Sequence, residues 1–221
     1  QVPSGLALLV AGGDNYTKSM GVSLTLSGSD NHSVAGYFLS ESSTTPGLDN
    51  FTAVTATDNY SASLSSTLLS GDGAKPVYAW LRDTAGNLGG SASDNISLDT
   101  TAPTVSVGSP SDNDSNSGPV SFTVSYTGAD NVTLAGDNVT VTATGTAAAG
   151  SKSVSGTGTE SRTITLDNLT GNGALTVSIA SGTATDLAGN SAPTASASDN
   201  ITVDNTVPSG LALTVAGGDA Y

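Results

Sequence analysis

The sequence predicts an all-β protein, and two observations lead to that prediction. Apolar and polar residues alternate along most of the chain, which is the period of a strand with one buried face. Clusters of Gly, Asp, Asn and Ser, such as "SGDGAK" and "TGNGAL", separate the alternating runs and are typical of turns. About seven short strands fall in each hundred residues, which is the number expected of an immunoglobulin-like β-sandwich.

Four runs show the alternation most clearly, and each is expected to form a strand with one apolar face. They are "VSLTLSG", "PVYAWLRD", "PVSFTVSYTG" and "NVTVTATG". Their apolar faces consist of Val22, Leu24 and Leu26; Val77, Ala79 and Leu81; Val120, Phe122, Val124 and Tyr126; and Val139, Val141 and Ala143. In the second run, Tyr78 and Trp80 share the opposite face. We interpret these two aromatics as core residues; the alternative is an exposed platform on which a sugar stacks.

Internal repeats divide the chain into modules. "VPSGLALLVAGGDNY" at residues 2–16 returns as "VPSGLALTVAGGDAY" at residues 207–221, and "RDTAGN" at residues 82–87 resembles "TDLAGN" at residues 185–190. We therefore predict module A over residues 1–101 and module B over residues 102–206. Residues 207–221 are either the first strand of a further A-type module or a strand donated to a neighbouring subunit. Short junctions that contain Pro predict a semi-rigid rod of tandem modules.

The charge of the chain restricts its partners. The net charge is −14, carried by 17 Asp together with Glu41 and Glu160. Such a surface repels nucleic acid and anionic membranes, whereas it suits divalent cations that take oxygen ligands. No run reaches the length of a transmembrane helix, so we expect no membrane insertion.

The residue types argue against an enzyme. The chain has no Cys, so it can form neither a disulfide nor a thiolate site, and its one His is His32, in the loop "SDNHSV". Ser and Asp are frequent, but no base completes a catalytic triad. Glu41 and Glu160 lie in different modules, so they do not form a glycosidase pair. We predict no catalytic residue.

One pattern, Asp-Asn-x-Ser/Thr, recurs more often than chance predicts. Ten of the fifteen Asn precede x-Ser/Thr, whereas the Ser and Thr content, roughly 29%, would give about four or five. All ten have Asp immediately before them, and among the other five Asn only Asn205 does. The ten are Asn15, Asn31, Asn50, Asn59, Asn95, Asn113, Asn131, Asn138, Asn168 and Asn200.

Turn chemistry and alternation explain part of this pattern, because Asp-Asn suits a corner at which a loop enters a strand. They explain neither the constant Asp nor Asn113, whose x is Asp114. Asn-x-Ser/Thr is the acceptor of N-glycosylation, so we predict that these ten Asn carry covalent N-glycans. Bacterial oligosaccharyltransferases prefer an acidic residue two positions before Asn, and Asp at the preceding position departs from that preference.

The motifs "LDTTAPT", "DTAGN", "DLAGN" and "GDGAKPVYAWLRD" resemble the bacterial Ig-like repeats of long secreted surface proteins and adhesins, over essentially the whole chain. The resemblance implies a secreted or cell-surface location and an extender role. The partners expected are neighbouring modules of the same chain and further copies in rods or filaments. The alternative is an adhesin module that itself binds a host or surface carbohydrate.

The same resemblance implies calcium at module junctions. An Asp in a turn at one pole of a sandwich can meet a linker Asp that leaves the same pole, and a bound Ca²⁺ would stiffen the hinge. The competing explanation is that Asp and Asn favour these turns through local hydrogen bonds. The candidate ligands are Asp83, Asn87, Asp99, Asp186, Asn190 and Asp204.

Overall fold

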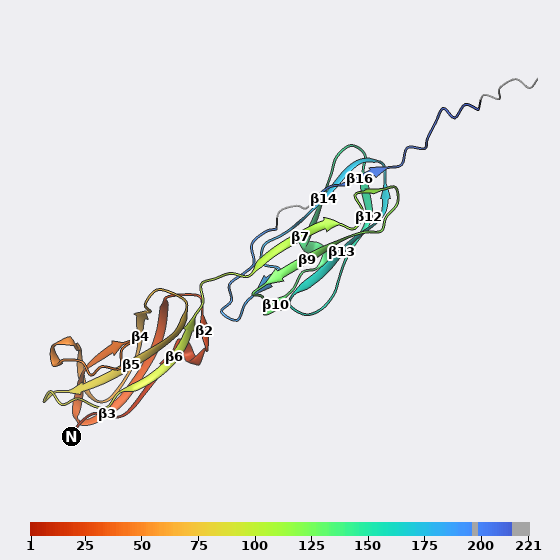
Figure 1. Ribbon diagram of the computed structural model, residues 1–221. Helices are drawn as coiled ribbons and strands as arrows, with labels where there is room; N and C mark the ends of the chain where they lie inside the picture. Colours follow the sequence, from red (N-terminus) through yellow and green to blue (C-terminus); the bar gives the residue numbers. More distant parts are fainter. Residues whose placement is uncertain (196–198, 214–221) are drawn as a thin grey trace, which may run out of the picture. The chain divides into compact units, whose positions relative to one another are not determined.

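A computed structural model describes residues 1–195 and 199–213 (Figure 1). The described residues form strands and short 3-10 segments, and none of them lies in an α-helix, which confirms the all-β prediction. The chain divides into two compact units. Unit 1 contains Gln1–Ala102 together with Asp186–Asn190, and unit 2 contains Pro103–Thr185 and the chain from Ser191 onward. Residues 214–221, the greater part of the predicted further or donated strand, lie outside the described residues.

Unit 1 is one six-stranded sheet that folds around its own core. The hydrogen-bonded order is β1-β3-β5-β6-β2, and β4 pairs with β3. All pairs are antiparallel except β2 with β6, which is parallel. Its elements are β1 (Ser4–Val10), η1 (Ala11–Gly13), β2 (Tyr16–Thr17), β3 (Gly21–Ser40), η2 (Leu48–Asn50), β4 (Thr52–Thr67), β5 (Gly73–Asp83) and β6 (Ala92–Leu98).

Two strands of unit 1 are much longer than the short strands that the sequence predicts. β3 has 20 residues and β4 has 16. Both pair along their length, but the register shifts between Ser29 and Val34. Before this bulge β3 pairs with β1, and after it β3 pairs with β5. β3 therefore pairs with different strands before and after the bulge, because the bulge bends it from one layer of the sandwich to the next.

Unit 2 is a sandwich of two four-stranded sheets with the orders β12-β13-β9-β7 and β11-β14-β16-β8. Lettering the main strands A to G along the chain gives D-E-B-A facing C-F-G, which is the immunoglobulin arrangement. Its elements are β7 (Thr104–Pro110), β8 (Asp114–Ser115), β9 (Val120–Thr127), β10 (Asn131–Val132), η3 (Gly136–Asn138), β11 (Val139–Ala143), β12 (Ala148–Ser155), β13 (Ser161–Thr170), β14 (Asn172–Ile179), β15 (Ala184–Thr185) and β16 (Ile201–Asp204).

Each unit has a separate apolar core, and alternation predicted the faces that line it. In unit 1 the cluster includes Leu24 and Leu26 of β3 and Leu81 of β5. In unit 2 it includes Phe122 of β9 and Leu166 of β13, both fully buried. The alternation fails toward the end of β11, where Val141 is half-buried and Ala143 is exposed, because β11 is the edge strand of its sheet.

Trp80 is buried, but outside the main core of unit 1. On β5, Val77, Ala79 and Leu81 face that core, and Trp80 faces the other way with only 3% of its surface exposed. Its ring lies 5.9 Å from that of Phe38, which in turn lies 6.0 Å from the ring of Phe51. Phe51 comes from the β3–β4 connection, so this connection covers the outer face of β5. The sugar-platform alternative is therefore wrong for Trp80, because its ring is covered.

Candidate functional site

The ten Asn of the Asp-Asn-x-Ser/Thr pattern lie on the surfaces of both units. Nine of their side chains are exposed, and Asn138 is half-buried. Asn138 lies in η3, where its Oδ1 accepts a hydrogen bond from the backbone N–H of Ala135 at 2.9 Å. Nine of the predicted acceptor amides are therefore open to solvent in the folded chain.

These ten Asn do not share one backbone environment. Asn59 and Asn95 lie within strands β4 and β6, Asn50 ends the 3-10 segment η2, and Asn15 lies in a bend. Asn168, in β13, has a positive φ of 54°. One type of turn or corner therefore does not account for the pattern.

Alternation accounts for about half of the pattern. The x residue is buried at Tyr60, Ile96, Val139, Leu169 and Ile201, so the flanking Asn and Ser/Thr must point outward there. At the other five positions x is half-buried or exposed, as at Tyr16, His32 and Asp114. The sequence Asp-Asn-x-Ser/Thr is therefore the same at all ten positions, although the burial of x differs among them.

The preceding Asp has a different structural role at different positions. Asp94 of β6 accepts a hydrogen bond from the backbone N–H of Val10 at 2.8 Å and so fastens β1 to β6. Asp58 accepts from the hydroxyl of Ser33 at 2.6 Å, and Asp167 accepts from the N–H of the next residue, Asn168, at 2.8 Å. No single fold requirement explains why Asp stands at these three positions.

Asp30 is the most unusual member of this group. It is 4% exposed, and its Oδ1 accepts from the backbone N–H of His32 at 2.7 Å. Its Oδ2 is buried and has no hydrogen-bond partner. A buried carboxylate oxygen without a donor costs stability, so the fold alone does not favour Asp at this position.

The predicted calcium ligands Asp83 and Asn87 form one closed turn. The side-chain amide of Asn87 donates to Oδ2 of Asp83 at 2.8 Å, and its backbone N–H donates to Oδ1 at 2.8 Å. Asp186 and Asn190 repeat this geometry, with distances of 2.9 Å and 2.8 Å. In both turns the carboxylate already has N–H donors, as the turn-chemistry explanation requires.

The linker residues Asp99 and Asp204 cap the backbone that follows them. Asp99 Oδ1 accepts from the N–H of Thr101 at 3.0 Å, and Asp204 Oδ1 accepts from the N–H of Thr206 at 2.8 Å. Hydrogen bonds from Thr206 hold the pKa of Asp204 below its usual value. Across residues 1–195 and 199–213, no three His, Asp or Glu side chains gather as ligands of one ion. Calcium binding stays a prediction.

A pair of residues that sequence reasoning missed holds the two linkers. Asp72, in the "SGDGAK" turn, accepts from the N–H of Thr100 at 2.9 Å and from the hydroxyl of Thr101 at 2.8 Å. Asn172, in the matching "TGNGAL" turn, accepts from the N–H of Asn205 at 2.7 Å. The turns share the motif Gly-Asp/Asn-Gly, which could have indicated this contact, although they lie 28 and 33 residues before the linker residues that they hold. Each unit thus fixes the start of its outgoing linker by hydrogen bonds.

Acid is expected to destabilise unit 1 through Asp83. Burial raises the pKa of this carboxyl, but hydrogen bonds from Asn87, Ala85 and Gly86 outweigh burial and leave the pKa below its usual value. Because the folded pKa is lower than the unfolded one, the charged form stabilises the fold above about pH 3.9. This contribution is lost as the pH falls through the folded pKa.

Urea unfolding followed by fluorescence tests this, because the single tryptophan, Trp80, reports on unit 1. Between about pH 6 and about pH 2, an Asp83→Asn variant should lose less stability than the unchanged chain. Asp14→Asn, at an exposed position of the same unit, should behave like the unchanged chain. Equal acid sensitivity of the Asp83→Asn variant would contradict the assignment.

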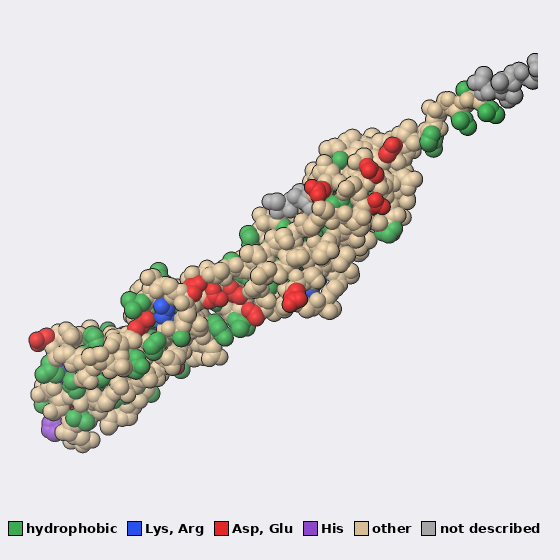
Figure 2. Space-filling model, viewed as in Figure 1, with side chains coloured by type: hydrophobic (Ala, Val, Ile, Leu, Met, Phe, Trp, Pro, Cys, Tyr) green, Lys and Arg blue, Asp and Glu red, His purple; other side chains and the backbone are tan. Residues whose placement is uncertain are grey.

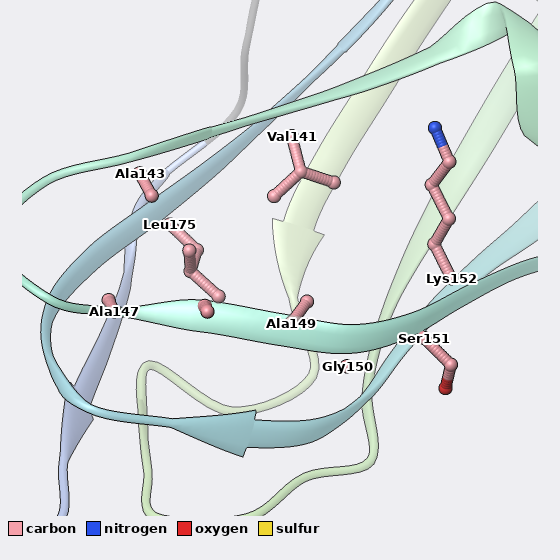
Figure 3. A pocket seen from close by; sticks show the side chains of 9 residues that line it. Val141, Ala143, Ala147, Ala149, Gly150, Ser151, Lys152 and Leu175 are labelled. Atoms are coloured by element: carbon pink, nitrogen blue, oxygen red, sulfur yellow. The ribbon is translucent and has the colours of Figure 1, made fainter.

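A cavity of about 410 Å³ lies in unit 2 at the open side of the sandwich, between β11 and β12. Val141, Ala147, Ala149 and Leu175 contribute apolar side chains to its lining (Figure 3). Lys152 is its one titratable lining residue, and its ammonium group donates a hydrogen bond to the carbonyl oxygen of Val139. The volume suits a small ligand, but the lining lacks the convergent polar groups that orient one.

The acidic character predicted from composition is visible on the surface. Figure 2 shows Asp and Glu side chains scattered over both units, with few Lys or Arg side chains between them. Within the described part of the chain, no helix has the length and apolar character that a membrane crossing requires.

Comparison with known proteins identifies no family. No protein-family model and no curated protein matches the chain. Among solved structures it is similar to the D00-D0 domain of Intimin, with 14% identity and a TM-score of 0.35 over 90% of this chain and 100% of that one. It is also similar to fibronectin(III)-like modules of Clostridium thermocellum CbhA, with 11% identity and a TM-score of 0.33 over 89% of this chain and 94% of that one. The immunoglobulin-like description therefore depends on the strand order and pairing of the chain itself.

Proposed function

We propose that the chain is a structural segment of an extracellular surface protein or filament, and that N-glycans coat it. The support comes from two all-β units with separate cores and from a strongly acidic surface. The motif resemblance to secreted surface repeats points the same way. In this role the units act as spacers. Their surface is the substrate of a glycosylating enzyme, and the units themselves catalyse no reaction.

One observation carries the glycan part of the proposal. Asp-Asn-x-Ser/Thr is constant in sequence, while the burial of x, the backbone conformation and the contacts of the Asp vary from position to position. A feature that folding requires would recur in one structural setting. A feature that a modifying enzyme reads needs to recur only in sequence and to leave the Asn accessible, as nine of the ten are.

Glycans would also protect the sheet edges. β4 has 16 residues and pairs with β3 alone among the described strands, so its other edge offers unpaired N–H and C=O groups. Its side chains are mostly exposed Thr, Ala and Ser, and Asp58 is its only charged residue. Long, weakly charged edges invite pairing with other chains. A glycan on Asn59, in the middle of β4, would block that pairing.

The test is mass spectrometry of the protein from its native source. Proteolytic peptides that cover these 221 residues should be heavier than their amino-acid sequences predict, and fragmentation should place the added mass on the ten Asn. Asn87, Asn172 and Asn190, which lack the pattern, should be bare. A bare polypeptide, or modification of those three residues, would contradict the proposal.

A matched pair of variants made in the native source tests whether the Asp is part of the signal. Asp58→Ser keeps Asn59-Tyr60-Ser61 intact, and Ser61→Ala removes the hydroxyl that every N-glycosylation acceptor needs. Both should leave Asn59 unmodified if the Asp is read. Full occupancy in Asp58→Ser would show that the Asp has another purpose.

The spacer role is tested separately from the glycans. The chain with its native modifications should bind no member of a glycan array. Specific and saturable binding of one carbohydrate would contradict the spacer role and favour a receptor-binding module.

A further inference from the structure

Four of the ten Asp-Asn-x-Ser/Thr motifs are closed in the folded chain. We call a motif closed when its Asp or its Asn is buried or half-buried, and open when both are exposed. The closed motifs are those of Asn31, Asn95, Asn138 and Asn168, and the open motifs are those of Asn15, Asn50, Asn59, Asn113, Asn131 and Asn200. Closed and open motifs share one sequence pattern, so the difference between them arises on folding.

Asp30, which precedes Asn31, is the most deeply buried of these carboxylates. Its side chain is 4% exposed, its Oδ1 accepts from the backbone N–H of His32 at 2.7 Å, and its Oδ2 is buried without a donor. Asn31 itself is exposed. An enzyme that approaches folded unit 1 can therefore reach the amide of Asn31 but not the carboxylate of Asp30.

Strand geometry closes the motif of Asn95. Neighbouring side chains of a strand point to opposite faces of the sheet, so Asp94 and Asn95 cannot be reached from one side. Both carboxylate oxygens of Asp94 also have donors, because Oδ2 accepts from the N–H of Val10 at 2.8 Å and Oδ1 accepts from the N–H of Asn95 at 2.9 Å. The folded sheet thus exposes Asn95 while Asp94 is half-buried.

Unit 2 closes its two motifs in other ways. Asp167 is half-buried, and its Oδ1 accepts from the N–H of Asn168 at 2.8 Å. Asn138 is itself half-buried, and its Oδ1 accepts from the N–H of Ala135 at 2.9 Å. In four different local structures, one part of the motif is withdrawn from an enzyme that would bind the folded chain.

We infer that the glycosylating enzyme acts on the chain before each unit folds, so that its substrate is the unfolded Asp-Asn-x-Ser/Thr segment. This inference rests on the proposed function, in which one enzyme reads the Asp, the Asn and the Ser/Thr of all ten motifs. An unfolded segment can turn all three side chains toward one binding site, whereas the closed motifs of a folded unit cannot.

The folded units can hold the product even where they hide the signal. Asn31, Asn95 and Asn168 are exposed, so a glycan attached to each of these amides extends into solvent after folding. The same order of events accounts for Asp30. Its buried oxygen without a donor costs stability in the folded unit, but an enzyme can read the carboxylate while the segment is unfolded.

The transfer requires an activated glycan, whose anomeric carbon is bonded to a phosphate oxygen. The side-chain Nδ2 of the Asn forms a bond to that carbon and loses one proton to a base of the enzyme. The bond between the carbon and the phosphate oxygen breaks, and the phosphate group leaves with the bonding electrons. In this chain only the Asn changes covalently.

The first measurement is the occupancy of each Asn in the protein from its native source. Site-resolved mass spectrometry should find the four closed motifs occupied to the same extent as the six open motifs. Occupancy of the open motifs alone would overturn the inference and would leave the glycan proposal standing.

The second experiment unfolds one unit at a time. Leu24 and Phe122 belong to separate cores and are 1% and 0% exposed. A buried charge without a partner is strongly destabilising, so Leu24→Asp should unfold unit 1 and Phe122→Asp should unfold unit 2. Trp80 fluorescence checks the unfolding of unit 1, and amide exchange in β9 checks that of unit 2.

The unchanged chain and both variants are made in a host that lacks the enzyme. Each is then incubated with an extract of the native source, which supplies the enzyme and its glycosyl phosphate donor. Asn31 and Asn95 should be modified at least about tenfold more in the Leu24→Asp chain than in the unchanged chain, because a folded unit opens rarely. Asn168 should rise only in the Phe122→Asp chain, so each variant is the control for the other.

The other outcomes separate the inference from the proposed function. Equal modification of Asn31, Asn95 and Asn168 in the folded unchanged chain would overturn the inference alone, and so would closed motifs that stay bare in an unfolded unit whose open motifs are modified. Absence of modification at every Asn of all three chains would contradict the proposed function and, with it, the inference.

Discussion

A Trp80→Ala variant should destabilise unit 1 by about 3–5 kcal/mol, the range for removing a large buried aromatic. Trp80 is 3% exposed, and its ring contacts Phe38 and Tyr78 at centroid distances of 5.9 and 6.0 Å. Removing it leaves a void beneath the β3–β4 connection. For a unit of this size the loss corresponds to a fall in Tm of at least about 10 °C.

The same variant should also loosen the connection that covers Trp80. This connection is fixed from outside by Arg82, whose guanidinium lies 5.4 Å from the ring centroid of Phe51 and donates to the carbonyl oxygen of Leu48 at 2.9 Å. Without Trp80, Phe38 loses one of its two aromatic contacts and Phe51 loses the support behind Phe38, so proteases should cleave between residues 41 and 51 before they cleave elsewhere in unit 1.

Differential scanning calorimetry and limited proteolysis check both expectations, and Tyr16→Ala is the control. Tyr16 is also an aromatic residue of unit 1, but it is 44% exposed, so its removal should change stability by no more than about 0.5 kcal/mol. Amide exchange in β9 of unit 2 should be unchanged, because Trp80 is no part of that core. Similar losses in the two variants would show that Trp80 contributes little as packing.

Alternation predicted which side chains face the cores because strand geometry fixes it locally. Val22, Leu24 and Leu26 lie on one face at any strand length, and so do Val120, Phe122 and Val124. Trp80 was predicted to be a core residue, and it is buried, but outside the core of unit 1. Its face of β5 is not the core face, and what covers it is a connection about thirty residues earlier in the chain, which alternation does not describe.

The candidate sites likewise contain some features that follow from local alternation and others that require the fold. The outward direction of Asn59 and Asn95 follows from the buried Tyr60 and Ile96 beside each of them. The contact of Asp94 with Val10, 84 residues away in sequence, requires the fold. The turn Asp83–Asn87 was recognised as special from sequence, yet only the direction of its side-chain amide shows that N–H groups already occupy the carboxylate.

Gly173→Ala should destabilise unit 2 by about 4 kcal/mol or more, or prevent its folding. Gly173 has a φ of +144°, and a Cβ there would lie 2.1 Å from the carbonyl oxygen of Thr144. That oxygen cannot move away cheaply, because the N–H of Thr144 donates to the carbonyl of Ala174 at 2.8 Å and its hydroxyl accepts from the N–H of Ala174 at 2.9 Å. These hydrogen bonds hold the backbone of Thr144 against the backbone of Gly173 and Ala174.

Gly73→Ala is a control that the sequence itself supplies. "SGDGAK" and "TGNGAL" place Gly73 and Gly173 at the same point of the same turn, and Gly73 also has a positive φ, +121°. A Cβ on Gly73, however, meets no heavy atom within 4 Å. Gly73→Ala should therefore cost only the backbone strain, about 1–3 kcal/mol.

The difference between the two variants isolates the close approach from the backbone conformation. Fluorescence of Trp80 follows unit 1 in the Gly73→Ala chain, and amide exchange in β13 and β14 follows unit 2 in the Gly173→Ala chain. Gly71 and Gly171 provide a second pair, since a Cβ on Gly171 would lie 2.0 Å from the carbonyl oxygen of Thr146 and one on Gly71 meets nothing within 4 Å. If Gly→Ala lowers stability equally at both members of each pair, backbone strain alone would explain these glycines. The short distance between the two backbones would then add nothing to the cost of the substitution.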